Sequence, residues 1–449
     1  MAFGAIIGVS WIILVGEWIE SVGAFGAIIA FTVGGLSIVP IGLCYAWLGK
    51  RMPTTGGEFV YAYKAFGSVI AYWTSWVLVL LYVSLCAFEA ISIAWIISAT
   101  LPAAMGPELY SVFGQSIAVG DLVAGVVVTI LLAFAHLRGA ELASIIQDAL
   151  TISMAVLSVV FIGAAIWGGT PENLSPAFVT DKAGKVLPGL IVLIIVTPLF
   201  FAGFGAIPQA LGESGPKAKR RLGLIITAVL LAAVVFYAAV IFATAYVLPV
   251  ADIAELELPA AEALQRAFGR KWLADLVLFA GMLGLLTTWN AVLFAGSRAL
   301  FALGRSGLAP YWLSAGSEEF GAPRNAILLI TLVTLTALPL GRQALLPIVS
   351  LGGLAVSYLF LIVALSALKL LPSHRVSALL AVFISIGLFG LSAYQLLQSA
   401  ISGRFAEVSV LLAWFLVGIA LWVFSKKSRS ELSEPARAAI IVGDAQNGG

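Results

Sequence analysis

The sequence predicts an all-α polytopic membrane protein with about twelve transmembrane helices, from its composition and from a repeated apolar pattern. Hydrophobic residues make up 61% of the 449 residues, and only 10% are charged, whereas soluble proteins carry roughly 25% charged residues. One soluble core cannot bury so much apolar surface. The composition therefore excludes a soluble enzyme, a disordered chain and a nucleic-acid binder, and it makes the lipid bilayer the expected environment.

The pattern is a series of apolar runs, each near the ~20 residues that a helix needs to cross a bilayer. An alternating strand pattern is absent, so a β-barrel is not expected. We predict one transmembrane domain over residues 1–425, with helices 1–5 at 2–168, helices 6–10 at 188–370 and helices 11–12 at 376–425, and a disordered cytoplasmic tail at 426–449. The runs lie near 2–20, 23–48, 69–100, 117–138, 142–168, 188–211, 221–248, 273–303, 325–340, 345–370, 376–400 and 407–425.

The orientation follows from the basic residues. If the N-terminus is cytoplasmic, most of the 24 lysines and arginines fall on the inner side, including the cluster at 217–221, as the positive-inside rule requires. We therefore predict a multi-pass protein of the cell membrane with both termini in the cytoplasm. Met1 lies three residues before Gly4 without a basic flank, which does not resemble a cleavable signal peptide. We expect that the first helix lacks its inner turns.

Two of the runs carry residues that interrupt an α-helix: Gly4–Ser10 in the first and Thr197–Pro208 in the sixth. A glycine costs about 1 kcal/mol in a helix interior and a proline about 3 kcal/mol. Irregular backbone is tolerated in a membrane only where it lines a cavity or is buried in protein, and transporters bind substrate at such breaks. The alternative is that the glycines only allow close helix packing, but two such regions together favour a break.

A break exposes N–H groups at the start of one half-helix and carbonyl groups at the end of the other. The N–H groups attract a carboxylate, and the carbonyl groups attract an ammonium group or Na⁺. A zwitterionic amino acid satisfies both, so the pattern predicts a small amino acid or amine as substrate. The substrate-binding residues expected at the first break are Ile7, Gly8, Val9 and Ser10.

Glu89 is a carboxyl group in the middle of the third run. An ionisable residue inside a membrane is costly and is a functional hypothesis by default. Glu89 is therefore a candidate proton carrier, or a counter-ion for a substrate amine. The alternative is a neutral, hydrogen-bonded structural glutamate.

The eighth run carries Thr287, Thr288 and Trp289. Threonine hydroxyls that face the first break would complete a Na⁺ site with backbone carbonyls, because hard cations prefer oxygen ligands. Trp289 would then line the substrate path. The alternatives are hydrogen bonds between helices for the threonines and simple packing for the tryptophan.

Several motifs together resemble the amino acid–polyamine–organocation (APC) family of permeases along nearly the whole chain. The resemblance implies a LeuT-type fold, in which helices 1–5 and 6–10 form an inverted repeat with helices 1 and 6 broken, plus two C-terminal helices. It also implies alternating access, and it favours Phe201, Ala202, Gly203 and Phe204 as the cavity wall. The motifs are Gly4–Gly8, Tyr45–Leu48, Met52–Pro53, Gly56–Tyr61, Ala65–Gly67, Phe200–Phe204 with Glu213 and Pro216, Ser297–Arg298, Gly307–Pro310 and Gly321–Pro323.

The chain departs from the family pattern at four positions. Val9 stands where the family usually has serine in Gly-Ser-Gly, so that carboxylate binding would rest on backbone N–H groups with help from the Ser10 hydroxyl. Trp47 and Gly205 stand where relatives commonly carry acidic residues. Met154 falls near a lysine that proton-coupled members can carry in the fifth helix, so amine-based coupling is expected to be absent.

Two acidic residues are candidates for gating. Glu213 would pair with an arginine of an inner loop to close the cytoplasmic gate, or it would be a solvated helix cap. Asp148 lies about two turns inside the fifth run, beside Gln147, and would serve inner gating or helix pairing.

The sequence contains no motif of an enzyme or an ATPase, so we expect secondary transport without a cofactor, driven by Na⁺ or H⁺. The histidines His136 and His374 are isolated and have no metal-ligand spacing around them. The family resemblance implies that a partner subunit, where one is present, is linked through a cysteine between helices three and four. The stretch 102–116 contains no cysteine, so no disulfide-linked partner subunit is expected. The alternatives to ion-coupled transport are a metabolite exchanger, a nutrient sensor on a transporter fold and a membrane-embedded enzyme.

Overall fold

The computed structural model describes residues 2–442 except 113, 181–183, 254, 257 and 317–320. Within these described residues, ten helices are long and apolar enough to cross a membrane, and Arg324–Leu340 is a shorter apolar helix. The all-α polytopic membrane fold is therefore confirmed. Residues 443–449 of the predicted tail lie outside the described residues.

The chain forms two compact units, which we call the first unit (residues 1–39, 145–204 and 227–288) and the second unit (residues 40–144, 205–226 and 289–449). Five helical elements continue from one unit into the other: α5 (Val39–Arg51), α9 (Ala140–Gly168), the 3₁₀ segment η3 (Thr197–Gly205), α13 (Leu222–Val247) and α16 (Lys271–Arg305).

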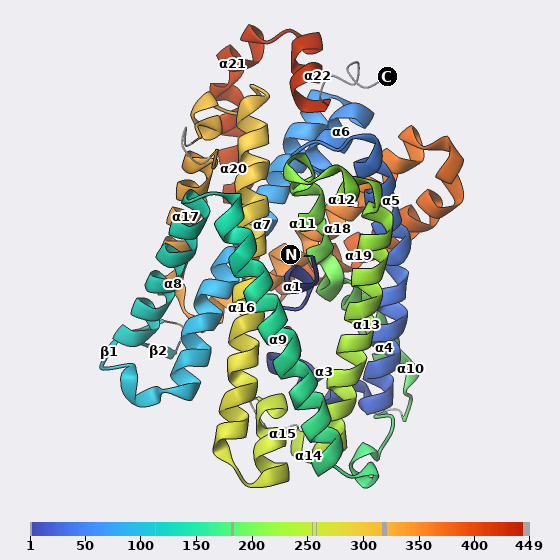
Figure 1. Ribbon diagram of the computed structural model, residues 1–449, viewed down its shortest axis with the longest axis vertical. Coiled ribbons are helices and arrows are strands. Elements are labelled where there is room, and N and C mark those ends of the chain that lie inside the picture. The colour runs from blue at the N-terminus through green and yellow to red at the C-terminus, as the bar shows by residue number, and fades with distance from the viewer. Residues whose placement is uncertain are drawn as a thin grey trace. The chain divides into compact units, whose positions relative to one another are not determined.

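In the first unit, α4 packs against α10 and α3 (Figure 1). Besides its parts of the five continuing elements, the first unit contains α1 (Ala2–Ile6), α2 (Ser10–Ile13), α3 (Val15–Val22), α4 (Ala24–Ser37), η2 (Pro171–Leu174), α10 (Leu187–Val196), α14 (Val250–Ile253) and α15 (Pro259–Phe268).

The first run is interrupted as predicted. Helix α1 ends at Ile6 and α2 begins at Ser10, with Val9 as its N-cap residue and no side-chain cap. Residues 7–9 between them are not helical. Glycine at position 8 favours this interruption because it pays a larger entropic cost in a helix than other residues.

The sixth run changes its winding instead of losing it. After α10, residues Thr197–Gly205 form a 3₁₀ helix, and α-helical winding resumes at Ala206. Pro198 has no N–H and cannot continue an α-helical hydrogen-bond ladder, and 3₁₀ runs of this length inside a helix are uncommon and often mark a functional hinge. The predicted break of the sixth run is therefore wrong as a gap, because a 3₁₀ helix of nine residues keeps the segment helical.

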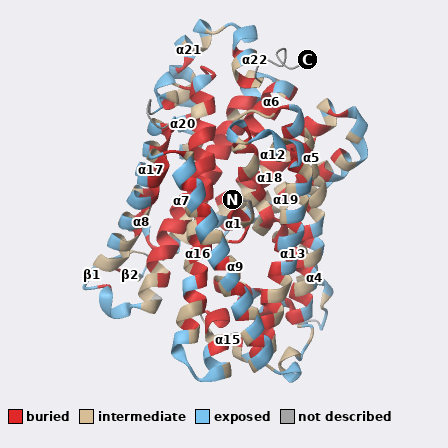
Figure 2. Cartoon of the chain, in the orientation of Figure 1, coloured by how far each residue is buried: buried red, intermediate tan, exposed pale blue. Residues whose placement is uncertain are grey.

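The second unit is built around α7, which is 89% buried over its most apolar stretch, whereas α20 is only 11% buried; Figure 2 shows this contrast. Apolar side chains exposed around α20 suit contact with lipid. The helices are α5 (Val39–Arg51), α6 (Glu58–Phe66), α7 (Ser68–Thr100), α8 (Val119–Leu137), α11 (Ala206–Gln209), α12 (Pro216–Arg220), α17 (Arg324–Ala337), α18 (Leu345–Leu370), α19 (Arg375–Ile401), α20 (Ala406–Phe424), α21 (Lys426–Glu431) and α22 (Glu434–Val442). The short 3₁₀ segments are η1 (Pro102–Ala104), η4 (Leu211–Glu213), η5 (Tyr311–Ser314), η6 (Leu338–Leu340), η7 (Arg342–Ala344) and η8 (Pro372–His374).

The second unit contains one feature that the sequence did not predict, and one expectation about it was wrong. The connection from α7 to α8 contains an antiparallel hairpin of β1 (Glu108–Val112) and β2 (Gln115–Ala118), which was not predicted (Figure 1). These strands are too short to stand out against the apolar runs on either side. The tail is not disordered over 426–442, because α22 packs on α6 and buries the Arg437 side chain.

Candidate functional site

The two interrupted segments contact each other inside the first unit. A Cβ atom on Gly203 would collide with the Ala5 carbonyl group and would lie 2.7 Å from the Ile6 nitrogen. Only a residue without a side chain allows this approach. The last turn of α1 and the 3₁₀ segment η3 therefore meet backbone to backbone.

Polar side chains converge on Gly4 in α1. Thr287 Oγ1 donates a hydrogen bond to the Gly4 carbonyl at 2.9 Å, and Thr288 Oγ1 donates to the same oxygen at 3.3 Å. A Cβ atom on Gly4 would contact the Thr151 hydroxyl and would lie 2.7 Å from Gln147 Nε2. Hydroxyl and amide groups of α9 and α16 thus surround this backbone position. The hydrogen bonds of Thr287 and Thr288 are of the interhelical kind given as the alternative, and the Na⁺ site stays a prediction.

The gap between α1 and α2 is bridged by Tyr237 of α13. The Tyr237 hydroxyl lies 3.3 Å from Ser10 Oγ and donates to the Ile6 carbonyl at 3.4 Å. The side chains of Ile7 and Val9 are buried, whereas Gly8 and Ser10 are partly exposed. Tyr237 was missed by the sequence analysis because its neighbours in the chain are uniformly apolar.

Aromatic rings form a wall beside this gap. The Phe201 ring lies 5.4 Å from Tyr237 and 6.3 Å from Phe31, measured between ring centroids. Phe200, which the sequence left ambiguous, lies 5.1 Å from Trp18 and is stacked at 5.7 Å on Phe31. These distances are typical of favourable aromatic pairs.

The remaining residues of η3 differ in their exposure. The side chain of Phe204 is fully buried, and Ala202 and Gly203 are partly exposed.

Met154 of α9 is buried close to the gap in the first run. A Cβ atom on Gly284 would lie 3.2 Å from the Met154 sulfur and 2.8 Å from the Gly8 carbonyl oxygen. A thioether is uncharged, so this position of α9 supplies no cation.

Glu89 and Trp289 belong to the second unit, where both side chains are buried. In the described part of the chain, Glu89 Oε2 has no hydrogen-bond partner. A buried polar atom without a partner is costly and calls for a functional or structural explanation. The predicted roles of both residues stay predictions.

Glu213 pairs with an arginine, as the sequence analysis proposed. Arg298 Nε lies 2.8 Å from Glu213 Oε1, and Arg298 Nη2 donates to Glu213 Oε2 at 3.1 Å. The guanidinium group also stacks on the Phe294 ring at 3.4 Å. Both the bidentate geometry and the burial of Arg298 make this a stronger pair than an exposed one.

Asp148 is exposed on α9, and its gating role stays a prediction. The buried residue is its neighbour Gln147, whose amide faces Gly4. Gln147 could have been singled out from the sequence, because an amide inside an apolar run also needs a hydrogen-bond partner. The sequence analysis chose Asp148 instead because it is charged.

A second carboxyl group, Glu58 of α6, was quoted only as part of a motif. Its side chain is 1% exposed and accepts hydrogen bonds from the Tyr45 hydroxyl at 2.9 Å and from Gln209 Nε2 at 2.6 Å. Burial raises the pKa of Glu58 to about 7, against the opposing effect of these hydrogen bonds. No charge in the sequence around it distinguishes this glutamate from a surface one.

His136 is not isolated but buried in the second unit. Its Nε2 lies 2.9 Å from Asn290 Oδ1, and Asn290 Nδ2 donates to the Ala143 carbonyl at 3.0 Å. The chain segments ending α8 and beginning α9 are thereby tied to α16. Trp47, where relatives carry an acidic residue, stacks on His374 with ring centroids 3.9 Å apart.

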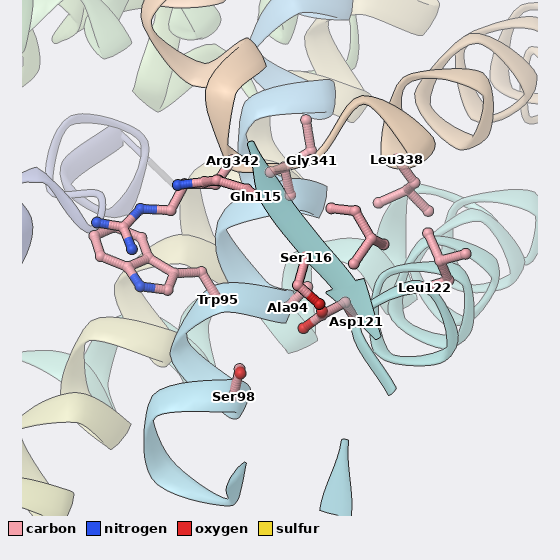
Figure 3. A pocket seen from close by; sticks show the side chains of 12 residues that line it. Ala94, Trp95, Ser98, Gln115, Ser116, Asp121, Leu122, Leu338, Gly341 and Arg342 are labelled. Carbon is pink, nitrogen blue, oxygen red and sulfur yellow. The ribbon is translucent and has the colours of Figure 1, made fainter. Parts of the chain in front are cut away.

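A cavity of about 280 Å³ lies in the second unit beside the β2 strand. Figure 3 shows Arg342 extended over the Trp95 ring, at 3.9 Å from its centroid, with Asp121 and Ser116 on the other side of the opening. None of the residues predicted to bind substrate lines this cavity.

Comparison with known proteins agrees with this architecture. Residues 1–375 match the amino acid permease family. The branched-chain amino acid permease BcaP of Bacillus subtilis is 24% identical over 97% of this chain and 92% of its own length. Two further B. subtilis proteins, each 26% identical, are the methylthioribose transporter (83% of this chain, 80% of its own) and the aspartate-proton symporter (73% and 63%).

The match covers far more than half of the chain, and it coincides with ten apolar helices and an interrupted first helix. The chain therefore belongs to the amino acid permease family. It is a multi-pass membrane protein that transports amino acids.

Proposed function

We propose that the chain is a secondary active transporter that binds one zwitterionic amino acid at the two interrupted helices and moves it by alternating access. The observation that carries the proposal is the contact of Gly203 with the last turn of α1, which places the 3₁₀ segment against the helix end that directly precedes the gap at residues 7–9. Such a site supplies peptide dipoles without requiring a charged side chain.

In this proposal the substrate carboxylate lies against the backbone N–H groups at the start of α2, around Val9 and Ser10. Ser10 Oγ and the Tyr237 hydroxyl, 3.3 Å apart, add hydrogen-bond donors. The ammonium group lies toward carbonyl groups at the end of α1. The notion of an inverted repeat, which makes α1–α2 and α10–η3 equivalent, belongs to the same proposal.

The side chains around the gap favour a neutral, apolar substrate. Phe31, Phe200, Phe201 and Tyr237 supply aromatic surface, and the polar groups named above are hydroxyls and amides. The relatives are named for branched-chain amino acids, for aspartate with a proton and for methylthioribose. Of these, a branched-chain amino acid suits an uncharged aromatic wall best.

The driving ion has two candidate sites. Na⁺ would be held by the Gly4 carbonyl with the Thr287 and Thr288 hydroxyls, since hard cations take oxygen ligands. A proton would be carried by a buried carboxyl, of which Glu89 is the one predicted from sequence. The Glu213–Arg298 pair would close the pathway on the cytoplasmic side, where the positive-inside rule places the inner loops.

The test is uptake into proteoliposomes. We expect L-leucine to enter in counterflow against internal L-leucine, and L-arginine and L-aspartate to compete at least about tenfold less well, because each would bury an uncompensated charge. Imposed Na⁺ and H⁺ gradients then identify the driving ion. Failure of every L-amino acid to enter would contradict the proposal.

The second candidate, an exchanger of related metabolites, keeps the same binding site. It predicts that uptake requires internal substrate and ignores both ion gradients. The same liposomes therefore separate exchange from ion-driven transport.

A further inference from the structure

We propose that Glu58 is a proton-binding site of the transporter, and that its proton holds α6 to α11, the short helix that follows the 3₁₀ segment. This inference rests on the proposed transport function and extends it with a residue and a ligand. The supporting observation is that α5, α7, α11 and the end of η3 enclose the Glu58 carboxyl group within the second unit.

The Glu58 side chain joins three helices. Tyr45 Oη of α5 donates to Oε1 at 2.9 Å, and Gln209 of α11 lies 2.6 Å from Oε2. A Cβ atom on Gly205, the last residue of η3, would lie 3.5 Å from Oε1. Tyr82 of α7 donates to the Gly205 carbonyl at 3.2 Å. The carboxyl group thus meets the end of the interrupted sixth helix directly.

The enclosure holds no cation for the carboxylate. Among the described residues Glu58 forms no ion pair, and the titratable groups that face it are the neutral phenols Tyr45, Tyr61 and Tyr82. Burying an ionised carboxylate without a cation is costly, so the neutral acid is favoured in this arrangement.

The other charged groups near α6 are engaged elsewhere. Glu434 of α22 accepts from Tyr63, and Lys369 of α18 lies over the Phe66 ring. Glu213 of η4 is paired with Arg298. None of them compensates the charge of Glu58.

One unpartnered atom beside Glu58 fits a bound proton. In the described residues, Gln209 Oε1 is buried without a hydrogen-bond partner. The 2.6 Å contact between Glu58 and Gln209 is short for N–H···O but ordinary for O–H···O. Since the two ends of an amide are assigned from their partners, a protonated Glu58 that donates to the Gln209 carbonyl, with the amide turned over, satisfies this oxygen.

Loss of the proton from Glu58 shifts the equilibrium between conformations in which α6 and α11 are in contact and conformations in which they are separated. The ionised carboxylate has no cation in the enclosure and is better solvated by water, so deprotonation favours conformations in which α6 and α11 separate. The pKa of Glu58, raised by burial to about 7, lies where cytoplasmic pH decides between the two states. Since a carboxyl exposed to water titrates near its ordinary value, the open population should rise by up to about tenfold per pH unit between that value and the midpoint, and it should level off above the midpoint.

The experiment measures hydrogen exchange of residues 58–66 and L-leucine counterflow from pH 6 to pH 8 in purified, reconstituted protein. In the wild type, exchange corrected for intrinsic chemistry and counterflow should both rise with pH, with a midpoint near 7. Glu58→Gln, which imitates the neutral acid in both conformations, should show neither rise, and its exchange and counterflow should lie below those of the wild type over this pH range.

Glu407→Gln is the matched control, because Glu407 is also buried and accepts from a neutral hydroxyl, that of Ser399 at 2.9 Å; it should keep both pH profiles. Tyr45→Phe removes a donor that stabilises the carboxylate, so it should move the midpoint to higher pH, and it decides the matter if Glu58→Gln does not fold. Unchanged profiles in Glu58→Gln, or an unmoved midpoint in Tyr45→Phe, would overturn the proposal. Absence of counterflow in the wild type would instead refute the transport function, while exchange would still test Glu58.

Discussion

The gap around Gly8 in the first unit and the polar clusters of the second unit differ in the kind of polar group that they contain. Around the gap, the polar atoms are backbone carbonyls with the hydroxyls of Thr287, Thr288 and Tyr237. In the second unit, the corresponding groups are ionisable side chains, namely Glu58 and the Glu213–Arg298 pair.

The difference indicates a division of labour. Backbone dipoles bind a small zwitterion without the cost of burying a permanent charge. Ionisable side chains respond to protonation or to the loss of a partner, so they suit conformational control. The first region should therefore be sensitive to added volume, and the second to altered charge.

The largest effect is expected from Gly203→Ala. The new methyl group collides with the Ala5 carbonyl, and such overpacking costs about 3 kcal/mol. Uptake of L-leucine should be abolished. Gly387→Ala in α19, where a Cβ atom meets nothing within 4 Å, should leave uptake intact. Wild-type uptake by Gly203→Ala would mean that the two segments do not need this contact.

The next effect concerns the ion pair. Glu213→Gln leaves the buried Arg298 guanidinium without its carboxylate, which should cost about 2 kcal/mol of stability and lower the melting temperature in detergent. The comparison is Asp252→Asn, which breaks the exposed Arg266–Asp252 pair and should cost less than about 1 kcal/mol. Equal losses in the two variants would remove the distinction between the pairs.

A smaller effect is expected from Thr287→Val, which keeps the shape and removes the hydroxyl bonded to Gly4. Loss of one neutral hydrogen bond of about 1 kcal/mol corresponds to a roughly fivefold higher KM for L-leucine. Thr336→Val removes an exposed hydroxyl bonded within its own helix and serves as control. A KM unchanged in Thr287→Val would show that the Gly4 cluster is not part of the transport site.

The smallest effect concerns the tail. Glu434 accepts hydrogen bonds from Tyr63 and Ser68 of the α6–α7 region, and the Tyr63 bond is the main reason that the pKa of Glu434 is lowered. A carboxyl whose pKa is lower in the folded state stabilises above its unfolded pKa, and this contribution is lost as the pH falls through the folded value. A spin label at Ala439→Cys should become more mobile below pH 4.5. Glu431→Gln should not alter this response, and Glu434→Gln should remove it.

The sequence allowed much of the fold to be predicted, because lipid imposes strong rules on a spanning segment. Length and hydrophobicity of the runs located the helices, and glycine located the gap near Gly8. The sixth run, where a break was also predicted, keeps helical winding as a 3₁₀ segment. The pairing of Glu213 with an arginine was also foreseen. The hairpin at 108–118 and the helices at 426–442 were not, since short segments are stabilised by what they pack against.

What the sequence by itself determined is therefore local: which segments are apolar, and where the backbone cannot keep an α-helical ladder. Only the tertiary structure decided which polar groups are buried together. Gln147 rather than Asp148 faces Gly4, and Glu58 meets Tyr45 and Gln209, because residues far apart in the chain become neighbours only after the helices pack. Burial and hydrogen bonding, which set the chemistry of a carboxyl group, are properties of that packing and not of the residue.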